Sequence, residues 1–129
     1  MLMSNKIIKN SFHFFRILYN RTKRRKTMDL NFIKKLYLDS QIKWSAHCLE
    51  RMQERDISIE DVGACIQSGE IIEDYPDDFP NPSCLVFGYN ISGKVIHIVV
   101  GTDQTYLYII TAYYPNTDKF MEDLKTRRK

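Results

Sequence analysis

The sequence predicts one α+β domain in which helices come first, followed by a mainly antiparallel sheet of four strands and a short C-terminal helix. Up to Gly69 the apolar residues recur at helical spacing, whereas later segments are rich in β-branched and aromatic residues and are separated by turns. The chain has 129 residues, 43% of them hydrophobic, with five Gly and four Pro. This length and composition suffice for one buried core and exclude collagen-like and wholly disordered chains.

Three N-terminal helices are expected, over residues 29–38, 45–55 and 58–69. The third has the clearest ends, because Ser58 is a favourable N-cap, Asp61 stands at the third helical position and Gly69 stops the helix. In the second helix Ser45 is the expected N-cap, and Ala46, Leu49 and Met52, three residues apart, are expected to face the core.

The four expected strands cover residues 70–75, 83–89, 94–102 and 106–114. The gaps at 90–93 and 103–105 are short enough for hairpins, whereas the Pro-rich gap at 76–82 predicts an extended loop. Consecutive strands joined in this way form an antiparallel meander. Apolar residues within 117–128 predict a short closing helix.

Residues 1–27 carry eight Lys and Arg and no acidic residue, so the rest of the chain has a net charge of −5. One interpretation is an arm that binds nucleic acid or an anionic membrane. The favoured interpretation is a basic extension outside the fold, with one domain over residues 28–129. No run approaches the roughly 20 apolar residues that a spanning helix requires, so no membrane partner is expected.

The cysteines and histidines indicate the redox compartment of the protein and whether a metal site is expected. The three cysteines, Cys48, Cys65 and Cys84, form no C-x-x-C pair and no disulfide framework. They are expected to be small core residues in a protein of the reducing cytoplasm. The three histidines are too widely spread to assemble a zinc site, so neither a metal nor another cofactor is expected.

A candidate catalytic group lies on the second expected helix, where His47, Arg51 and Arg55 are four residues apart and share a face. Metal-free RNA cleavage requires a base for the 2′-hydroxyl proton, an acid for the leaving oxygen and cations for the charge on phosphorus. Imidazole and guanidinium groups suit these tasks. The alternative is an ordinary solvated face on which Glu50 and Glu54 pair with the arginines.

His97 and Tyr113 extend this candidate site. His97 stands in a Val and Ile run, where it is either a buried, hydrogen-bonded histidine or points to the same cleft as His47. The phenol of Tyr113, near the end of the last strand, could orient a phosphate. The C-terminal cations are expected to hold flanking RNA phosphates, and they are Lys125, Arg127, Arg128 and Lys129.

A long set of residues carries a resemblance to a known family. These residues are Ser45, Ala46, His47, Arg51, Met52, Arg55, Ile57, Ser58, Asp61, Val62, Gly69, Glu70, Ile71, Ile72, Glu73, Asp74, Tyr75, Pro76, Pro80, Pro82, Ser83, Leu85, Gly88, His97, Val99, Val100, Thr111, Ala112, Tyr113, Pro115, Phe120, Lys125, Arg127 and Arg128. Over about residues 40–129 the chain resembles the bacterial domain-of-unknown-function family numbered 4258. Cys48 and the leader of 27 residues depart from the family pattern.

This resemblance implies a fold similar to the RelE-like bacterial toxins, several of which are metal-free ribonucleases that cleave messenger RNA. It also implies a small zinc-finger antitoxin as a protein partner. The polar residues of the family pattern fall on His47, Arg51, Arg55, His97, Thr111 and Tyr113.

Two functions are therefore expected as alternatives. The first is a toxin-type, metal-independent endoribonuclease that cleaves single-stranded or messenger RNA by attack of the 2′-hydroxyl. In it His47 or His97 is the base or acid, Arg51 and Arg55 hold the phosphate, and Tyr113 positions the backbone. The second is a non-catalytic protein-binding module that uses its sheet edge or the His47 helix face. The net charge of −5 outside the leader favours this second function.

Overall fold

A computed structural model describes residues 28–129, which form an α+β domain with three helices and a five-stranded sheet. The expectations for residues 1–27 lie outside the described residues. The helices are α2 (Leu30–Leu38), α3 (Ala46–Glu54) and α4 (Ile59–Ser68). The strands are β1 (Ile42–Trp44), β2 (Glu70–Tyr75), β3 (Ser83–Tyr89), β4 (Val95–Thr102) and β5 (Leu107–Tyr113).

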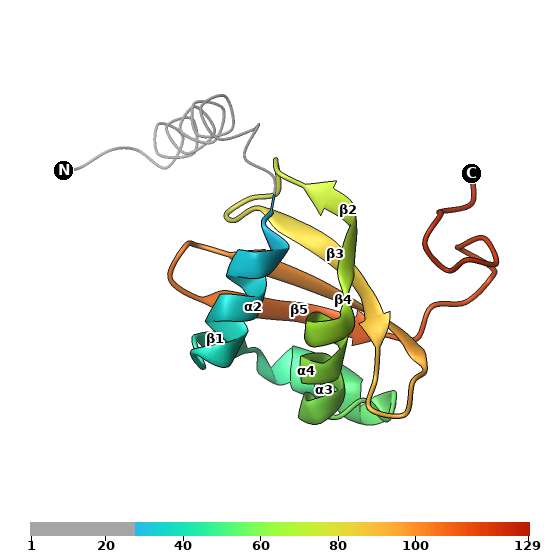
Figure 1. Ribbon diagram of the computed structural model, residues 1–129, viewed down its shortest axis with the longest axis horizontal. Coiled ribbons are helices and arrows are strands. Elements are labelled where there is room, and N and C mark those ends of the chain that lie inside the picture. The colour runs from blue at the N-terminus through green and yellow to red at the C-terminus, as the bar shows by residue number, and fades with distance from the viewer. Residues whose placement is uncertain (1–27) are drawn as a thin grey trace, which may run out of the picture.

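The strands lie in the order β1-β5-β4-β3-β2, and the three helices pack on one face of the sheet (Figure 1). The antiparallel meander from β2 to β5 confirms the expected hairpin connections. The prediction of four strands is wrong, because β1 adds a fifth strand, parallel to β5 at the sheet edge. Its three residues are too few to produce a recognisable alternation, and they become a strand only through pairing with Leu107–Tyr113.

Local sequence signals set the helix starts as expected. The Ser58 side chain accepts from the Asp61 backbone N–H at 3.0 Å, and the Asp61 carboxylate accepts from the Ser58 N–H at 2.9 Å. Ser45 caps α3 by accepting from the Cys48 N–H at 3.0 Å. Of the three expected core residues of α3, Met52 is buried, whereas Ala46 and Leu49 are exposed because the helix turns Cys48 inward instead.

The main core lies between the helices and the sheet. It contains Ile66 from α4, Val86 from β3 and Ile98 from β4, all fully buried, and the three cysteines are buried and unpaired as expected. Helix α4 packs so closely on β3 that a Cβ at Gly88 would lie 2.3 Å from the Cys65 carbonyl oxygen. A residue without a side chain is therefore required at this crossing.

After Tyr114, the C-terminal segment, residues 115–129, extends away from the helices (Figure 1), and its Phe120 ring packs on His97 at the opposite face of the sheet. The expected helix over 117–128 is wrong, because this segment consists of turns and one bridge between Phe120 and Arg127. The side chains of Asn116 and Asp123 each accept from backbone N–H groups two and three residues later. Such bonds compete with helix formation.

No helix within residues 28–129 has both the length and the apolar character needed to cross a membrane.

Candidate functional site

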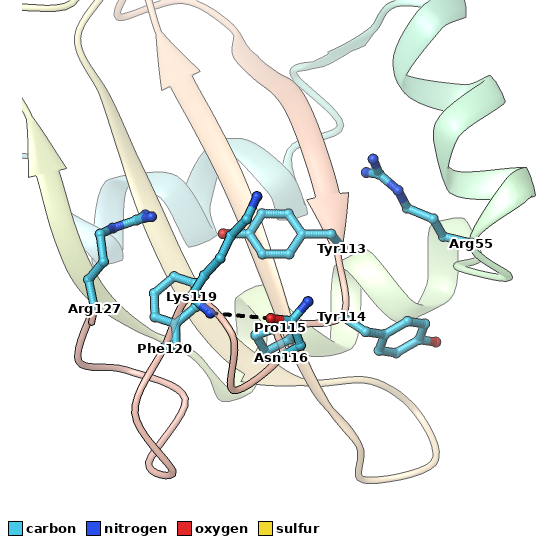
Figure 2. A pocket seen from close by; sticks show the side chains of 8 residues that line it. All are labelled: Arg55, Tyr113, Tyr114, Pro115, Asn116, Lys119, Phe120 and Arg127. Atoms are coloured by element: carbon cyan, nitrogen blue, oxygen red, sulfur yellow. Dashed lines mark hydrogen bonds between the residues drawn. The ribbon is translucent and has the colours of Figure 1, made fainter. Parts of the chain in front are cut away.

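A cavity of about 350 Å³ opens beside the C-terminal end of β5, between the end of α3 and the C-terminal segment (Figure 2). Three of its eight lining residues are cations and none is acidic. The lining residues are Arg55, Tyr113, Tyr114, Pro115, Asn116, Lys119, Phe120 and Arg127. A concave site with this charge favours an anionic ligand, and its volume lies within the range of about 300–1,000 Å³ usual for small-molecule sites.

Arg55 reaches the cavity because it is the C-cap residue of α3, beside β5. Its Nη1 atom donates to the Ala112 carbonyl at 2.8 Å and to the Thr111 hydroxyl at 3.3 Å. These two bonds hold the guanidinium against the strand. Both bonds use the same guanidinium nitrogen, so N–H groups of the planar guanidinium remain available to a ligand.

Arg127 approaches the cavity from the C-terminal segment. Its Nε and Nη2 atoms donate to the two Glu73 oxygens at 3.1 and 3.0 Å, and its guanidinium lies 4.7 Å from the centroid of the Phe120 ring. The hydrogen bonds from Arg127 are the main reason that the pKa of Glu73 is lowered, although burial opposes them. Glu73 therefore stays ionised and neutralises part of the charge of Arg127.

Lys119 supplies the third cation. Its side chain is exposed at the mouth of the cavity, and Figure 2 shows Tyr113 between Arg55 on one side and Lys119 and Arg127 on the other. Neither Lys119 nor Arg55 forms an ion pair with any residue of the part of the chain described. These two residues therefore provide most of the uncompensated positive charge.

His97 lies directly behind Tyr113 and is fully buried. Its Nε2 atom is 2.6 Å from the Leu124 carbonyl oxygen, and its Nδ1 atom is 3.2 Å from the Tyr113 hydroxyl. A carbonyl oxygen only accepts, so Nε2 carries the hydrogen and donates to Leu124. In the neutral ring Nδ1 then accepts from the Tyr113 O–H.

Burial determines the protonation of this pair at neutral pH. Desolvation is the largest influence on His97 and lowers its pKa, while the Leu124 hydrogen bond and the Glu73 charge oppose it. Desolvation also raises the pKa of Tyr113. Both groups are therefore neutral near pH 7, and one hydrogen bond joins the cavity surface to a buried imidazole.

The structure brings three of the predicted site residues, Arg55, Tyr113 and Arg127, to one cavity and places a fourth, His97, behind it. It does not bring His47 there. A helix rises 1.5 Å per residue, so His47 lies about 12 Å along α3 from Arg55. His47 is exposed, and Arg51 pairs with Glu54 at 3.0 Å, as the solvated-face alternative expected.

The other predicted RNA-binding cations do not line the cavity. Lys125 pairs with Glu70 at 2.5 Å and lies 4.7 Å from the centroid of the Phe87 ring. The Nε atom of Arg128 donates to the Thr117 carbonyl at 2.6 Å, and Lys129 is exposed. These cations stabilise or extend the C-terminal segment around the site.

Sequence reasoning missed Lys119 and Asn116. Lys119 falls within the stretch 117–128 that was expected to be helical, and Asn116 lies directly before it. The turn residues Pro115 and Asn116, directly after the last strand, were the available signal that the chain reverses there.

Residues 28–129 contain no group of three or more His, Cys, Asp or Glu side chains that could hold a metal ion. The candidate chemistry of the cavity rests on the three cations, the Tyr113 phenol and the imidazole behind it.

Comparison with known proteins identifies a family. The model of a family described as a domain of unknown function, DUF4258, matches residues 44–114. No curated protein and no solved structure matches the chain. The matched range runs from the end of β1 through β5 and includes Arg55, His97 and Tyr113, whereas Lys119 and Arg127 lie beyond it.

Proposed function

This chain belongs to the DUF4258 family, and we propose that it is a toxin-type endoribonuclease that cleaves single-stranded RNA without a metal ion. One observation carries the proposal: two arginines, a lysine and a phenol converge on one cavity whose lining contains no acidic residue. A phosphodiester is the anion that this set of groups suits best, because guanidinium forks match phosphate oxygens and a phenol can orient the sugar beside them.

The cations have a role in the transition state as well as in binding. Attack of the 2′-hydroxyl on phosphorus builds negative charge on the non-bridging oxygens. Arg55, held by its two bonds to β5, supplies positive charge at a fixed position beside that centre, and Lys119 adds a second positive charge at the mouth of the cavity. Donors organised before the reaction stabilise such charge without further rearrangement.

The remaining predicted site residues contact RNA outside the cavity in this proposal. His47 and Arg51 lie on the exposed face of α3, the helix that ends at Arg55, and Lys129 lies at the end of the C-terminal segment. They contribute to affinity through flanking phosphates. This revises the expected mechanism, in which His47 or His97 was the base or acid, because the cavity is lined by Tyr113, with His97 behind it, and not by His47.

Incubation of the full chain with mixed single-stranded RNA in a metal chelator tests the proposal. We expect products with 2′,3′-cyclic phosphate ends and a loss of about 10-fold or more in cleavage rate for Lys119→Gln, since removing a charge donor at a transition state lowers the rate strongly. Lys34→Gln removes the same charge from α2, on the other side of the sheet, and is expected to cleave normally.

The result that overturns the proposal is an absence of cleavage both for free RNA and for a message under translation in a cell-free extract. Cleavage that persists unchanged in Lys119→Gln would also remove the cavity from the reaction.

One observation favours the second candidate function, a protein-binding module. A shallow apolar hollow at the β1–β5 edge is lined by Trp44, Ile109 and Ile110 among others, and Ile110 is 47% exposed. A zinc-finger antitoxin is the partner that the family resemblance suggested. Co-expression with the product of a neighbouring zinc-finger reading frame tests this function, and Ile110→Arg is expected to abolish the complex while leaving RNA cleavage unchanged.

A further inference from the structure

We propose that Tyr113 and His97 form a proton relay that acts as the general base of the reaction, in which Tyr113 takes the 2′-hydroxyl proton and passes its own to His97. The inference rests on the proposed function, and it assigns different roles to the two side chains. Tyr113 lines the cavity and touches the substrate, whereas His97 is fully buried and acts only through Tyr113. Tyr113 is thus the catalytic residue and His97 the positioning residue.

The direction of the Tyr113–His97 hydrogen bond follows from the other bond of the imidazole. Because the Leu124 carbonyl accepts from Nε2–H, the lone pair of Nδ1 faces the Tyr113 hydroxyl, 3.2 Å away. The phenol therefore donates its hydrogen inward, and its oxygen lone pairs remain for a donor in the cavity. A ribose hydroxyl is such a donor.

Packing fixes the imidazole in this orientation. His97 and Tyr113 are directly opposite on β4 and β5, with ring centroids 5.3 Å apart. The Phe120 ring stands perpendicular to the imidazole with its centroid at 4.7 Å, and Phe87 packs with its centroid at 5.9 Å. A ring enclosed in this way cannot turn toward the cavity, so proton exchange with a substrate must pass through Tyr113.

Charged groups face the pair from each neighbouring element. Glu73 on β2 favours the imidazolium form of His97, and Arg127 on the C-terminal segment opposes it. Arg127 and Arg55 favour an ionised Tyr113, and Glu73 opposes this. A neutral imidazole can accept a proton, and the Leu124 carbonyl and the nearby Glu73 carboxylate then stabilise the cation that forms.

The proton and bond changes balance between Tyr113, the buried His97, Lys119 and water. The 2′-hydroxyl gives its proton to the Tyr113 oxygen while the phenolic proton moves to His97 Nδ1. The O2′–P bond forms and the P–O5′ bond breaks. The leaving 5′-oxygen takes a proton from the ammonium group of Lys119. Water then reprotonates Lys119, and His97 returns its proton to solvent through Tyr113 after the product leaves.

The first test compares Tyr113→Phe with the wild-type chain. The substitution keeps the ring against His97 and removes the relay oxygen, so kcat is expected to fall by about 100-fold or more, the usual range for a general base. Affinity for an RNA with a 2′-deoxy sugar at the scissile position is expected to change less than 3-fold, an order-of-magnitude expectation for losing one neutral hydrogen-bonding group. Tyr108→Phe removes a phenol from the same strand outside the cavity and is expected to cleave normally.

The pH profile separates a relay from a structural role. In the wild-type chain kcat/KM is expected to rise tenfold per pH unit below the His97 pKa and to level off above it, because the neutral imidazole is the active form. The residual activity of Tyr113→Phe and of His97→Gln should lack this limb. Thermal unfolding shows whether the His97→Gln chain is folded. If it is not, the pH profile of Tyr113→Phe alone distinguishes a relay from a structural role.

A substrate with a bridging 5′-sulfur separates the base from the acid. A thiolate leaves without protonation, so this substrate is expected to relieve the part of the Lys119→Gln loss that comes from the missing acid, but not to raise the rate of Tyr113→Phe. Nitrogen NMR of the wild-type chain gives a reading that does not depend on activity. The neutral His97 ring must carry its hydrogen on Nε2, and a hydrogen on Nδ1 overturns the relay.

The failures of the two proposals are distinct. No cleavage of any RNA by the wild-type chain overturns the proposed function, and the relay with it. Cleavage by the wild-type chain that survives in Tyr113→Phe, or a wild-type profile without the acidic limb, overturns only the relay.

Discussion

On the helix-covered face of the sheet, aliphatic side chains such as Ile98 and Val86 pack against α4, whereas the opposite face places His97 and Tyr113 under an irregular segment. Contacts on the first face are apolar and non-directional. Those on the second are hydrogen bonds, ring contacts and the Glu73–Arg127 ion pair. The difference separates the part of the domain that provides stability from the part that carries candidate chemistry.

The cationic cavity is lined from the second face by Tyr113, Phe120 and Arg127, and Arg55 reaches it from the end of α3. Directional contacts can hold a polar group at a fixed place, and the cavity needs Arg55, Tyr113 and Arg127 at fixed places. A change in the shape of a side chain on the apolar, helix-covered face lowers the stability of the fold.

The largest expected effect comes from a substitution in the core on the helix-covered face. Ile98→Ala removes a fully buried side chain and should lower the free energy of unfolding by about 2–5 kcal/mol. Ile110→Ala makes the same change at an exposed position of β5 and should alter that free energy by about 0.5 kcal/mol or less. Urea unfolding of both variants measures the difference. Equal losses would mean that the two faces contribute alike to stability.

The sequence predicted the helix-covered face better because its signals are local. Ser58 and Asp61 form their capping box within one turn, and the four main strands are marked by their own residues and turns. Strand β1 has no such signal. Its three residues gain strand geometry only by pairing with β5, more than 60 residues later.

The candidate site was predictable residue by residue but not as an arrangement. Arg55, Tyr113 and His97 were selected for their chemistry, and the structure brings them together. Phe120 and Leu124 have helical spacing, yet their contacts with His97 on β4 determine their positions. The turns that bring Lys119 to the cavity depend on these long-range contacts.

A smaller effect is expected from removing the Glu73–Arg127 ion pair on the opposite face. Glu73→Gln removes the carboxylate that accepts two bonds from Arg127 and should lower the free energy of unfolding by about 1 kcal/mol at pH 7, since Arg127 is half exposed and solvent weakens the pair. The same change leaves Arg127 unneutralised beside the cavity. Affinity for RNA should therefore rise while stability falls, and a joint loss of both would show that the pair is needed to build the site.

The pH dependence of that difference follows from the lowered pKa of Glu73. A carboxylate whose pKa is lower in the folded chain contributes stability above its unfolded pKa of about 4.3 and loses that contribution as the pH falls through the folded value. Wild-type and Glu73→Gln chains should therefore differ most above about pH 5 and converge in stronger acid. Unfolding measured across this range checks the sign, and a difference that grows in acid would contradict it.

The smallest expected effect concerns the charge of the cavity alone. Each phosphate contact with single-stranded RNA releases about 0.7 counterion, so Lys119→Gln should reduce the slope of log affinity against log salt by about 0.7. Lys34→Gln, on the helix-covered side, should leave the slope unchanged. Binding of a 2′-deoxy-substituted RNA over a salt series measures both slopes without cleavage. If the slopes fall equally, RNA binds through the general charge of the chain rather than the cavity. A fall confined to Lys119→Gln places a phosphate at the cavity, independently of which groups carry out the chemistry.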